Sequence, residues 1–285
     1  GGGFHVCALS TGGEIKCWGA NLTGQLGDGT TANRLTPVNV LTTPGGTPLA
    51  GITAISADAE HTCALTTGGT IKCWGDGEHG KLGDGTDTTR HTPVDVLSTP
   101  GGAPLTSITA ISAGGSHTCA LTTSGGVKCW GWNGWGEVGD GTGLRRFSPV
   151  SVLNAAGGTP LTGIGAITTG DLQSCARTTS GGLKCWGQND KGQLGDGTSG
   201  MYNHSLMPVQ VQGLTSGVTA FRIDASPAPI CVCANAIRLN GTTLLRKPST
   251  RKGNQRDRPE GKLWRVASRT MTSVTAAMPV RETTR

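Results

Sequence analysis

The sequence predicts an all-β protein, a β-propeller built from repeated four-stranded blades, and three observations support this prediction. The same fifteen-residue frame, seen at residues 61–75, occurs four times at a constant step of 56 residues. A fixed period of this size is typical of a repeat architecture. Each frame holds two short runs of alternating apolar and polar residues around Gly, Ser or Thr, which predicts a hairpin. The 48 glycines and 4% aromatic residues suit a chain rich in strands and turns.

The second copy predicts four strands per unit. The expected strands are residues 52–56, 61–66, 70–75 and 92–97. A glycine-rich loop follows the third strand, and a Pro-Gly-Gly loop leads into the next copy. Short strands separated by turn signals are the pattern of a propeller blade or a β-sandwich. The repetition favours the propeller, because a sandwich has no reason to recur at a fixed period.

Two cysteines mark the hairpin of every copy. A three-residue turn with glycine in the left-handed conformation would place Cys63 opposite Cys73, close enough for a disulfide. A two- or four-residue turn would oppose Cys73 to Ala64 instead. The predicted bridges therefore join the two cysteines of each copy: Cys7 with Cys17, Cys63 with Cys73, Cys119 with Cys129, and Cys175 with Cys185. Closing a loop of about ten residues should stabilise each blade by about 2 to 3 kcal/mol.

Metal binding is an alternative role for these cysteines, because His61, Cys63 and Cys73 are residue types that bind zinc. The fourth copy argues against it, since Gln173 replaces the histidine while both cysteines remain. We therefore expect disulfides rather than a metal or buried free thiols. Disulfides at this density indicate an oxidising compartment, and thus an exported or surface-displayed protein. Cys231 and Cys233 lie outside the pattern and have no predicted role.

The glycine-rich loop reads Gly80-Lys-Leu-Gly-Asp-Gly-Thr86 and recurs from Gly24, Gly136 and Gly192. With this turn, the His-x-x-Ala-Leu strand and the Trp-Gly strand, the sequence resembles the regulator of chromosome condensation repeat over residues 1 to about 220. The resemblance implies a β-propeller, usually of about seven blades. The four copies would then form an incomplete propeller.

The resemblance implies a choice of functions. The leading one is a non-enzymatic scaffold that binds another protein. The alternative is guanine-nucleotide exchange on a small GTPase, or chromatin binding. The paired cysteines and the long Pro-Gly-Gly loop resemble secreted bacterial members of the family, so the expected location is extracellular or at the surface of a bacterial cell.

The Gly-Asp-Gly-Thr loops do not predict a ligand site. Calcium loops need several oxygen ligands at alternate positions, and each loop offers one aspartate. Residues 75–81 resemble part of a phosphate loop, but Leu82 stands where Ser or Thr is needed. We interpret the loop as a tight turn in which aspartate caps backbone amides and glycine supplies positive φ. No metal or cofactor is expected.

No catalytic constellation emerges from the sequence. His79, His91 and His204 lie in variable loops without a partnered nucleophile or carboxylate at a telling spacing. Paired carboxylates that would indicate glycan hydrolysis are also not recognisable. We therefore expect no enzymatic activity.

Binding residues are expected where the copies differ, because shared positions serve the fold. The shared tryptophans are predicted to pack between blades: Trp18, Trp74, Trp130 and Trp186. The third copy departs most, and its predicted partner-binding residues are Trp132, Trp135, Arg145, Arg146 and Phe147. Trp and Arg are enriched at binding hot spots. The alternative is that these rings only cover the edge of the adjacent blade.

Charge divides the chain. Residues 1–227 carry 12 Lys and Arg against 15 Asp and Glu, a net charge of −3, while residues 228–285 carry 12 against 3, a net charge of +9. The repeats therefore do not predict a nucleic-acid surface. The repeat pattern defines one domain at residues 1–221. Residues 222–285 form a basic tail, either disordered or the product of a frame shift. No apolar run approaches the roughly 20 residues of a membrane span.

Overall fold

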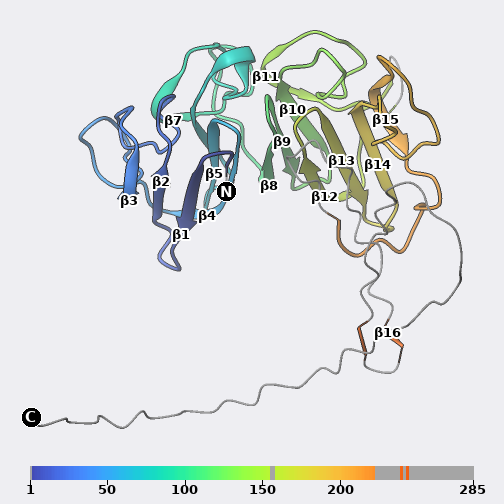
Figure 1. The fold of residues 1–285 in the computed structure, drawn as a ribbon, viewed down its shortest axis with the longest axis horizontal. Coiled ribbons are helices and arrows are strands. Elements are labelled where there is room, and N and C mark those ends of the chain that lie inside the picture. The colour runs from blue at the N-terminus through green and yellow to red at the C-terminus, as the bar shows by residue number, and fades with distance from the viewer. Residues whose placement is uncertain (1, 155–157, 222–237, 240–241, 244–285) are drawn as a thin grey trace, which may run out of the picture. The chain divides into compact units, whose positions relative to one another are not determined.

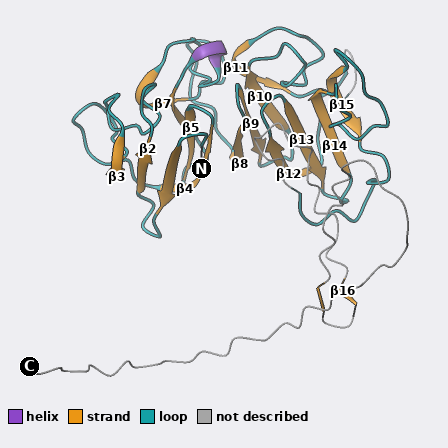
Figure 2. Ribbon diagram, viewed as in Figure 1, coloured by secondary structure: helices purple, strands orange, loops and turns teal. Residues whose placement is uncertain are grey.

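The repeats form antiparallel sheets that lie side by side in chain order (Figure 1). This is a computed structural model that describes residues 2–154, 158–221, 238–239 and 242–243. Three sheets have four strands and the first has three. The predicted all-β propeller architecture is confirmed. The described residues include one helical turn, the 3₁₀ helix η1 (Glu78–Gly80), as Figure 2 shows.

Each sheet corresponds to one copy of the repeat. The first contains β1 (His5–Leu9), β2 (Ile15–Gly19) and β3 (Arg34–Asn39). The second contains β4 (Ile52–Asp58), β5 (His61–Thr66), β6 (Ile71–Gly75) and β7 (Arg90–Asp95). The third contains β8 (Ile108–Ala113), β9 (His117–Thr122), β10 (Val127–Gly131) and β11 (Arg146–Ser151). The fourth contains β12 (Ile164–Thr169), β13 (Gln173–Thr178), β14 (Leu183–Gln188) and β15 (His204–Gln210).

Residues 235–285 form a separate unit. Its described residues pair as two short strands, β16 (Arg238–Leu239) and β17 (Thr242–Thr243). Apart from these four residues, the expectations for residues 222–285, including those for Cys231 and Cys233, lie outside the described part of the chain. Within the part described, no helix has the length and apolar character needed to cross a membrane.

The predicted hairpin register is confirmed. Residues 67–69 form the turn between β5 and β6, closed by a hydrogen bond from the Thr66 amide to the Thr70 carbonyl at 2.9 Å. Gly69 has a φ of +72°, which an L side chain rarely adopts. Cys63 consequently lies opposite Cys73. The same opposition of cysteines recurs in all four hairpins.

The fourth strand of the blade begins earlier than predicted. In the second sheet it is Arg90–Asp95 rather than residues 92–97. The pairing with β6 shifts register between Cys73 and Gly75, so that Gly75 lies opposite Arg90. Pro93 lies within this irregularity, on the outermost strand, where its missing N–H interrupts no regular ladder.

The core lies between neighbouring sheets. One buried cluster joins Leu65 and Ile71 of the second repeat to Ala120 and Trp130 of the third. Five of the six residues of β5 are buried, whereas only His5 of the five residues of β1 is buried. Each repeat therefore buries its apolar face against the next repeat, as expected for a repeat protein.

Candidate functional site

Four disulfides stabilise the hairpins. They join Cys7 to Cys17, Cys63 to Cys73, Cys119 to Cys129, and Cys175 to Cys185. Cys63 and Cys73 are therefore bonded to each other. Nε2 of His61, the third residue of the alternative metal site, is hydrogen-bonded to the Thr118 hydroxyl at 2.9 Å. Among the described residues no group of His, Cys, Asp and Glu is arranged to hold a metal ion.

Three of the four shared tryptophans lie between repeats. Trp74 is fully buried, and its Nε1 donates to the Gln25 carbonyl of the preceding repeat at 2.9 Å. Trp130 and Trp186 make the equivalent bonds to the carbonyls of Lys81 and Glu137. A Cβ on Gly27 would lie 2.7 Å from Trp74 Nε1, so the loop needs glycine to admit the ring. Trp18 is half-buried, in contrast to the other three.

A ladder of buried histidines also joins the repeats. His61 Nε2 bonds to the Thr118 hydroxyl of the next repeat, and the equivalent bonds join His5 to Thr62 and His117 to Ser174, each at 2.8 Å. Each hydroxyl in turn donates to a loop carbonyl of the repeat before it. Because the hydroxyl proton is used in that bond, Nε2 must be the donor, and this fixes the tautomer.

The other ring nitrogen of each of these histidines has no hydrogen-bond partner among the described residues. Nδ1 of His5, His61 and His117 is buried, and no described atom bonds to it. Burial disfavours the charged form, which lowers the pKa of His117 to about 3 and that of His5 to about 4. Burial, with a smaller contribution from the Lys81 charge, also lowers the pKa of His61 well below its usual value. These histidines are neutral, structural groups.

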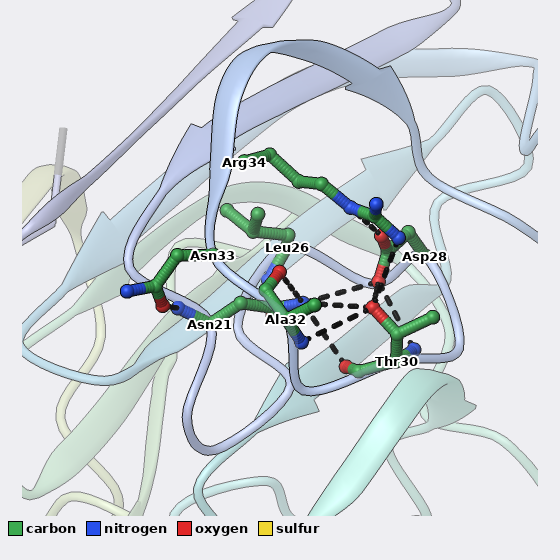
Figure 3. A network of polar contacts seen from close by, with 7 residues as sticks. All are labelled: Asn21, Leu26, Asp28, Thr30, Ala32, Asn33 and Arg34. Carbon is green, nitrogen blue, oxygen red and sulfur yellow. Dashed lines mark hydrogen bonds and ion pairs between the residues drawn. The ribbon is translucent and has the colours of Figure 1, made fainter.

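The glycine-rich turn is held by a polar network (Figure 3). Asp28 Oδ1 accepts from the Thr30 amide at 3.0 Å and from the Thr30 hydroxyl at 2.7 Å, and Gly27 and Gly29 have positive φ. The interpretation of the loop as an aspartate-capped turn is confirmed. Asn21, which the sequence reasoning missed, is buried and donates Nδ2 to Asp28 at 3.1 Å.

An arginine completes this network. Arg34 Nε donates to Asp28 Oδ2 at 2.7 Å, and Asp84 with Arg90 forms the same pair in the second repeat. Burial alone would raise the pKa of Asp28, but the bonds from Thr30 and Arg34 hold it below the usual value. The recurrence of Arg six residues after Asp was the sequence signal that could have identified this pair.

Of the five predicted partner-binding residues, two make internal contacts that belong to the fold. Arg146 pairs with Asp140, with Nε 2.6 Å from Oδ2, as Arg34 and Arg90 do in their repeats. Phe147 packs on the loop of the second repeat, where a Cβ on Gly80 would lie 2.7 Å from its ring. We therefore leave Arg146 and Phe147 out of the candidate site.

The other three belong to a surface group that we call the aromatic cluster. Its members come from the second, third and fourth repeats, in the loops or, for His204, at the start of β15: His79, Trp132, Trp135, Arg145, Tyr202 and His204. Trp132 has its ring centroid 4.6 Å from that of His79, and the Arg145 guanidinium carbon lies 5.8 Å from the Trp132 ring. Trp135 is parallel to Tyr202 within 9° at 6.3 Å, and Tyr202 is 70% exposed.

A buried carboxyl group lies beneath the cluster. Glu137 is fully buried, and its Oε2 accepts from the Trp135 amide at 2.9 Å. Its Oε1 is buried without a partner among the described atoms. Burial raises the pKa of Glu137 to about 7. The equivalent residues of the first and second repeats are Gln25 and Lys81. Of these three repeats, only the third has an acidic residue at this buried position.

Sequence reasoning found three members of the cluster and missed the others. His79, Tyr202 and His204 belong to neighbouring repeats, and only the fold brings their rings to Trp132 and Trp135. The sequence did carry a signal, since all three stand where the copies differ: His79 lies in η1, Tyr202 lies in the loop before β15, and His204 begins β15.

The stacked sheets, the hairpin disulfides and the inter-repeat tryptophans define a repeat protein of the β-propeller class. Models of the regulator of chromosome condensation (RCC1) repeat match residues 13–65, 69–121 and 180–223, and a second model of this repeat matches residues 52–81, 108–136 and 166–193. The chain belongs to the RCC1 repeat family, as the resemblance of its motifs predicts.

Two curated relatives each match about three quarters of the chain. The chain is 31% identical over 212 residues to the human E3 ubiquitin-protein ligase HERC2, a match that covers 74% of this chain and 4% of the ligase. It is 33% identical over 211 residues to the ultraviolet-B receptor UVR8 of Arabidopsis thaliana, a match that covers 74% of this chain and 44% of the receptor. The chain thus spans less than half the length of either relative.

Solved structures share the fold. Human WBSCR16 matches with a TM-score of 0.61 at 22% identity, over 79% of this chain and 55% of that one. Prp20p of Saccharomyces cerevisiae, which was characterised together with its binding to Gsp1p and histones, matches with a TM-score of 0.57 at 21% identity, over 74% of this chain and 49% of that one.

Proposed function

We propose that this chain is a non-enzymatic module that binds another protein through the aromatic cluster, and that it acts outside the cell or at its surface. The observation that carries the proposal is the cluster itself. Two groups of half-buried and exposed rings lie on the loops of three repeats, Trp132 with His79 and Arg145, and Trp135 with Tyr202 and His204, at positions where the copies differ. Trp, Tyr and Arg are the residue types that dominate binding energy at protein interfaces.

The family membership supports this proposal at a coarser level. Prp20p, with the same fold, is described by its binding to the proteins Gsp1p and histones. Because the match covers only 4% of HERC2, the ligase activity of HERC2 is not transferred to this chain.

The binding test uses peptides selected from a random display library against the immobilised chain. We expect Trp132→Ala and Trp135→Ala to weaken the selected peptides by at least about tenfold, because each substitution removes an aromatic anchor. The matched control is Leu22→Ala, which removes another exposed apolar side chain, 78% exposed, from the corresponding loop of the first repeat. Unchanged affinity for the cluster variants would contradict the proposal, and a large fall in their melting temperature would assign both rings to packing.

The location is tested separately. The four disulfides support an oxidising compartment. Thiol titration of freshly isolated protein should therefore find the eight repeat cysteines oxidised. Reduced cysteines would instead favour an intracellular role, such as nucleotide exchange or chromatin binding.

A further inference from the structure

Arg145 is an exposed cation to which the described part of the chain offers no carboxylate partner. Its neighbour Arg146 pairs with Asp140, and the other arginine ion pairs of the described residues involve Arg34 and Arg90. Arg145 instead lies over the face of Trp132. A guanidinium within about 6 Å of an indole ring is attracted to its face, and the planar edge of N–H donors suits a carboxylate.

The polar surroundings leave most of the guanidinium free. Arg145 Nη1 donates to His79 Nδ1 at 3.4 Å, and His79 Nε2 lies 3.5 Å from Glu78 Oε1. The proton of a neutral His79 is therefore on Nε2, and the ring uses one guanidinium N–H. A guanidinium has five such donors, and the described residues supply no acceptor for the others.

Comparison of the repeats shows that this arginine is not required by the turn. In the first repeat the side-chain oxygen of the equivalent residue, Asn33, accepts from the backbone amide of Asn21 at 2.9 Å. In the second repeat the hydroxyl of Thr89 accepts from the backbone amide of Gly77 at 3.4 Å. Both side chains hold their own loop. Arg145 makes no such bond and is directed instead to Trp132.

We propose that Arg145 binds a carboxylate of the partner, and that the Trp135 and Tyr202 rings cover an apolar side chain beside it. The partner segment is thus a protein segment with Asp or Glu flanked by apolar residues. This inference rests on the proposed function. A polyanion such as a nucleic acid fits less well, because residues 1–227 carry 12 Lys and Arg against 15 Asp and Glu, a net charge of −3.

The test observes the tryptophan indole N–H signals of the whole chain by NMR. The probes are the peptide acetyl-Gly-Leu-Glu-Leu-Gly-amide, its Gln counterpart, and inorganic phosphate. We expect the acidic peptide to shift the signals of Trp132 and Trp135 and to leave those of the buried inter-repeat tryptophans unchanged. The Gln peptide should bind about tenfold more weakly, since a hydrogen bond to a charged group is stronger than one to an amide.

Arg145→Gln should remove the preference for the acidic peptide, whereas the matched control Lys16→Gln, which removes an exposed lysine from the first repeat, should retain it. Equal binding of both peptides at the cluster would overturn the carboxylate inference and leave the proposed function standing. Stronger shifts with phosphate than with the acidic peptide would also overturn it. If neither these probes nor any display-selected peptide depended on the cluster, the proposed function itself would fail.

Discussion

Acid should destabilise the repeats through the histidine ladder, and His117→Gln isolates this effect. His117 is fully buried, donates Nε2 to Ser174, and has no partner for Nδ1. Glutamine is tolerated at this position, since Gln173 occupies it in the fourth repeat. The substitution removes one titrating group while keeping a polar side chain.

The sign and size follow from proton linkage. Burial lowers the pKa of His117 from 6.5 to about 3, so below about pH 6.5 the unfolded chain binds a proton that the folded chain excludes. Stability is therefore lost as the pH falls from about 6.5 toward 3, by about 1.4 kcal/mol per pH unit. Between about pH 7 and pH 5 the loss due to His117 is about 2 kcal/mol.

Other groups titrate in the same window with the opposite sign. Burial raises the pKa of Glu137 to about 7 and that of Asp58 to about 6, so each favours the folded state as the pH falls. Wild-type stability alone would mix these contributions. The difference between wild type and His117→Gln cancels them, because both proteins contain the same carboxyl groups.

The assay is urea unfolding of the oxidised protein, followed by tryptophan fluorescence at about pH 7 and pH 5. The advantage of wild type over His117→Gln should shrink by about 2 kcal/mol at the lower pH. His91→Gln, which makes the same exchange at an exposed histidine, is the control for the effect of the substitution itself. An advantage that is the same at both pH values would refute the assignment of a buried neutral histidine.

Three further predictions concern the interior. Glu137→Gln should raise the free energy of unfolding by about 2 to 3 kcal/mol near pH 8, because the raised pKa of Glu137 makes its ionisation in the folded protein unfavourable. The gain should fade toward about pH 5, and a gain that is independent of pH in urea unfolding would contradict this. Trp130→Ala should lower stability by about 3 to 5 kcal/mol, whereas Trp18→Ala, at a half-buried site, should cost clearly less; equal losses on thermal unfolding would contradict the inter-repeat role. Replacing Cys119 and Cys129 together by alanine should cost about 2 to 3 kcal/mol in urea, and non-reducing mass mapping that linked cysteines of different repeats would undermine the reasoning.

The fold could be predicted because the same pattern of cysteine, tryptophan and glycine occurs four times in the chain. Cys63 and Cys73 at a fixed spacing leave few possible hairpin registers, and the three-residue turn with Gly69 at positive φ selects the one that opposes them. The start of β7 could not be predicted in this way. It depends on the irregular pairing around Pro93, which is a property of two strands rather than one.

The candidate site was only partly predictable, because its rings come from different repeats. Trp132 and Trp135 stand out in sequence, but His79 and Tyr202 become their neighbours only when the loops of adjacent repeats meet. Likewise, adjacent arginines have different roles: the turn geometry gives Arg146 an aspartate and leaves Arg145 on the surface.

The third repeat lacks a buried ion pair that the second repeat has, and it presents a tryptophan of the aromatic cluster instead. A double substitution should restore the ion pair and remove the tryptophan. In the second repeat, Asp76 and Lys81 form an ion pair in which both side chains are largely buried, while in the third Trp132 and Glu137 occupy these positions and the carboxyl group lacks a cation. Trp132→Asp combined with Glu137→Lys should recreate the pair, raise the urea midpoint above that of either single variant, and abolish binding of cluster-dependent peptides. If the stability change of the double variant only equalled the sum of the two single changes, the two new side chains would not interact, and the expected ion pair would be refuted. Retained peptide binding would show that Trp132 is dispensable for the cluster.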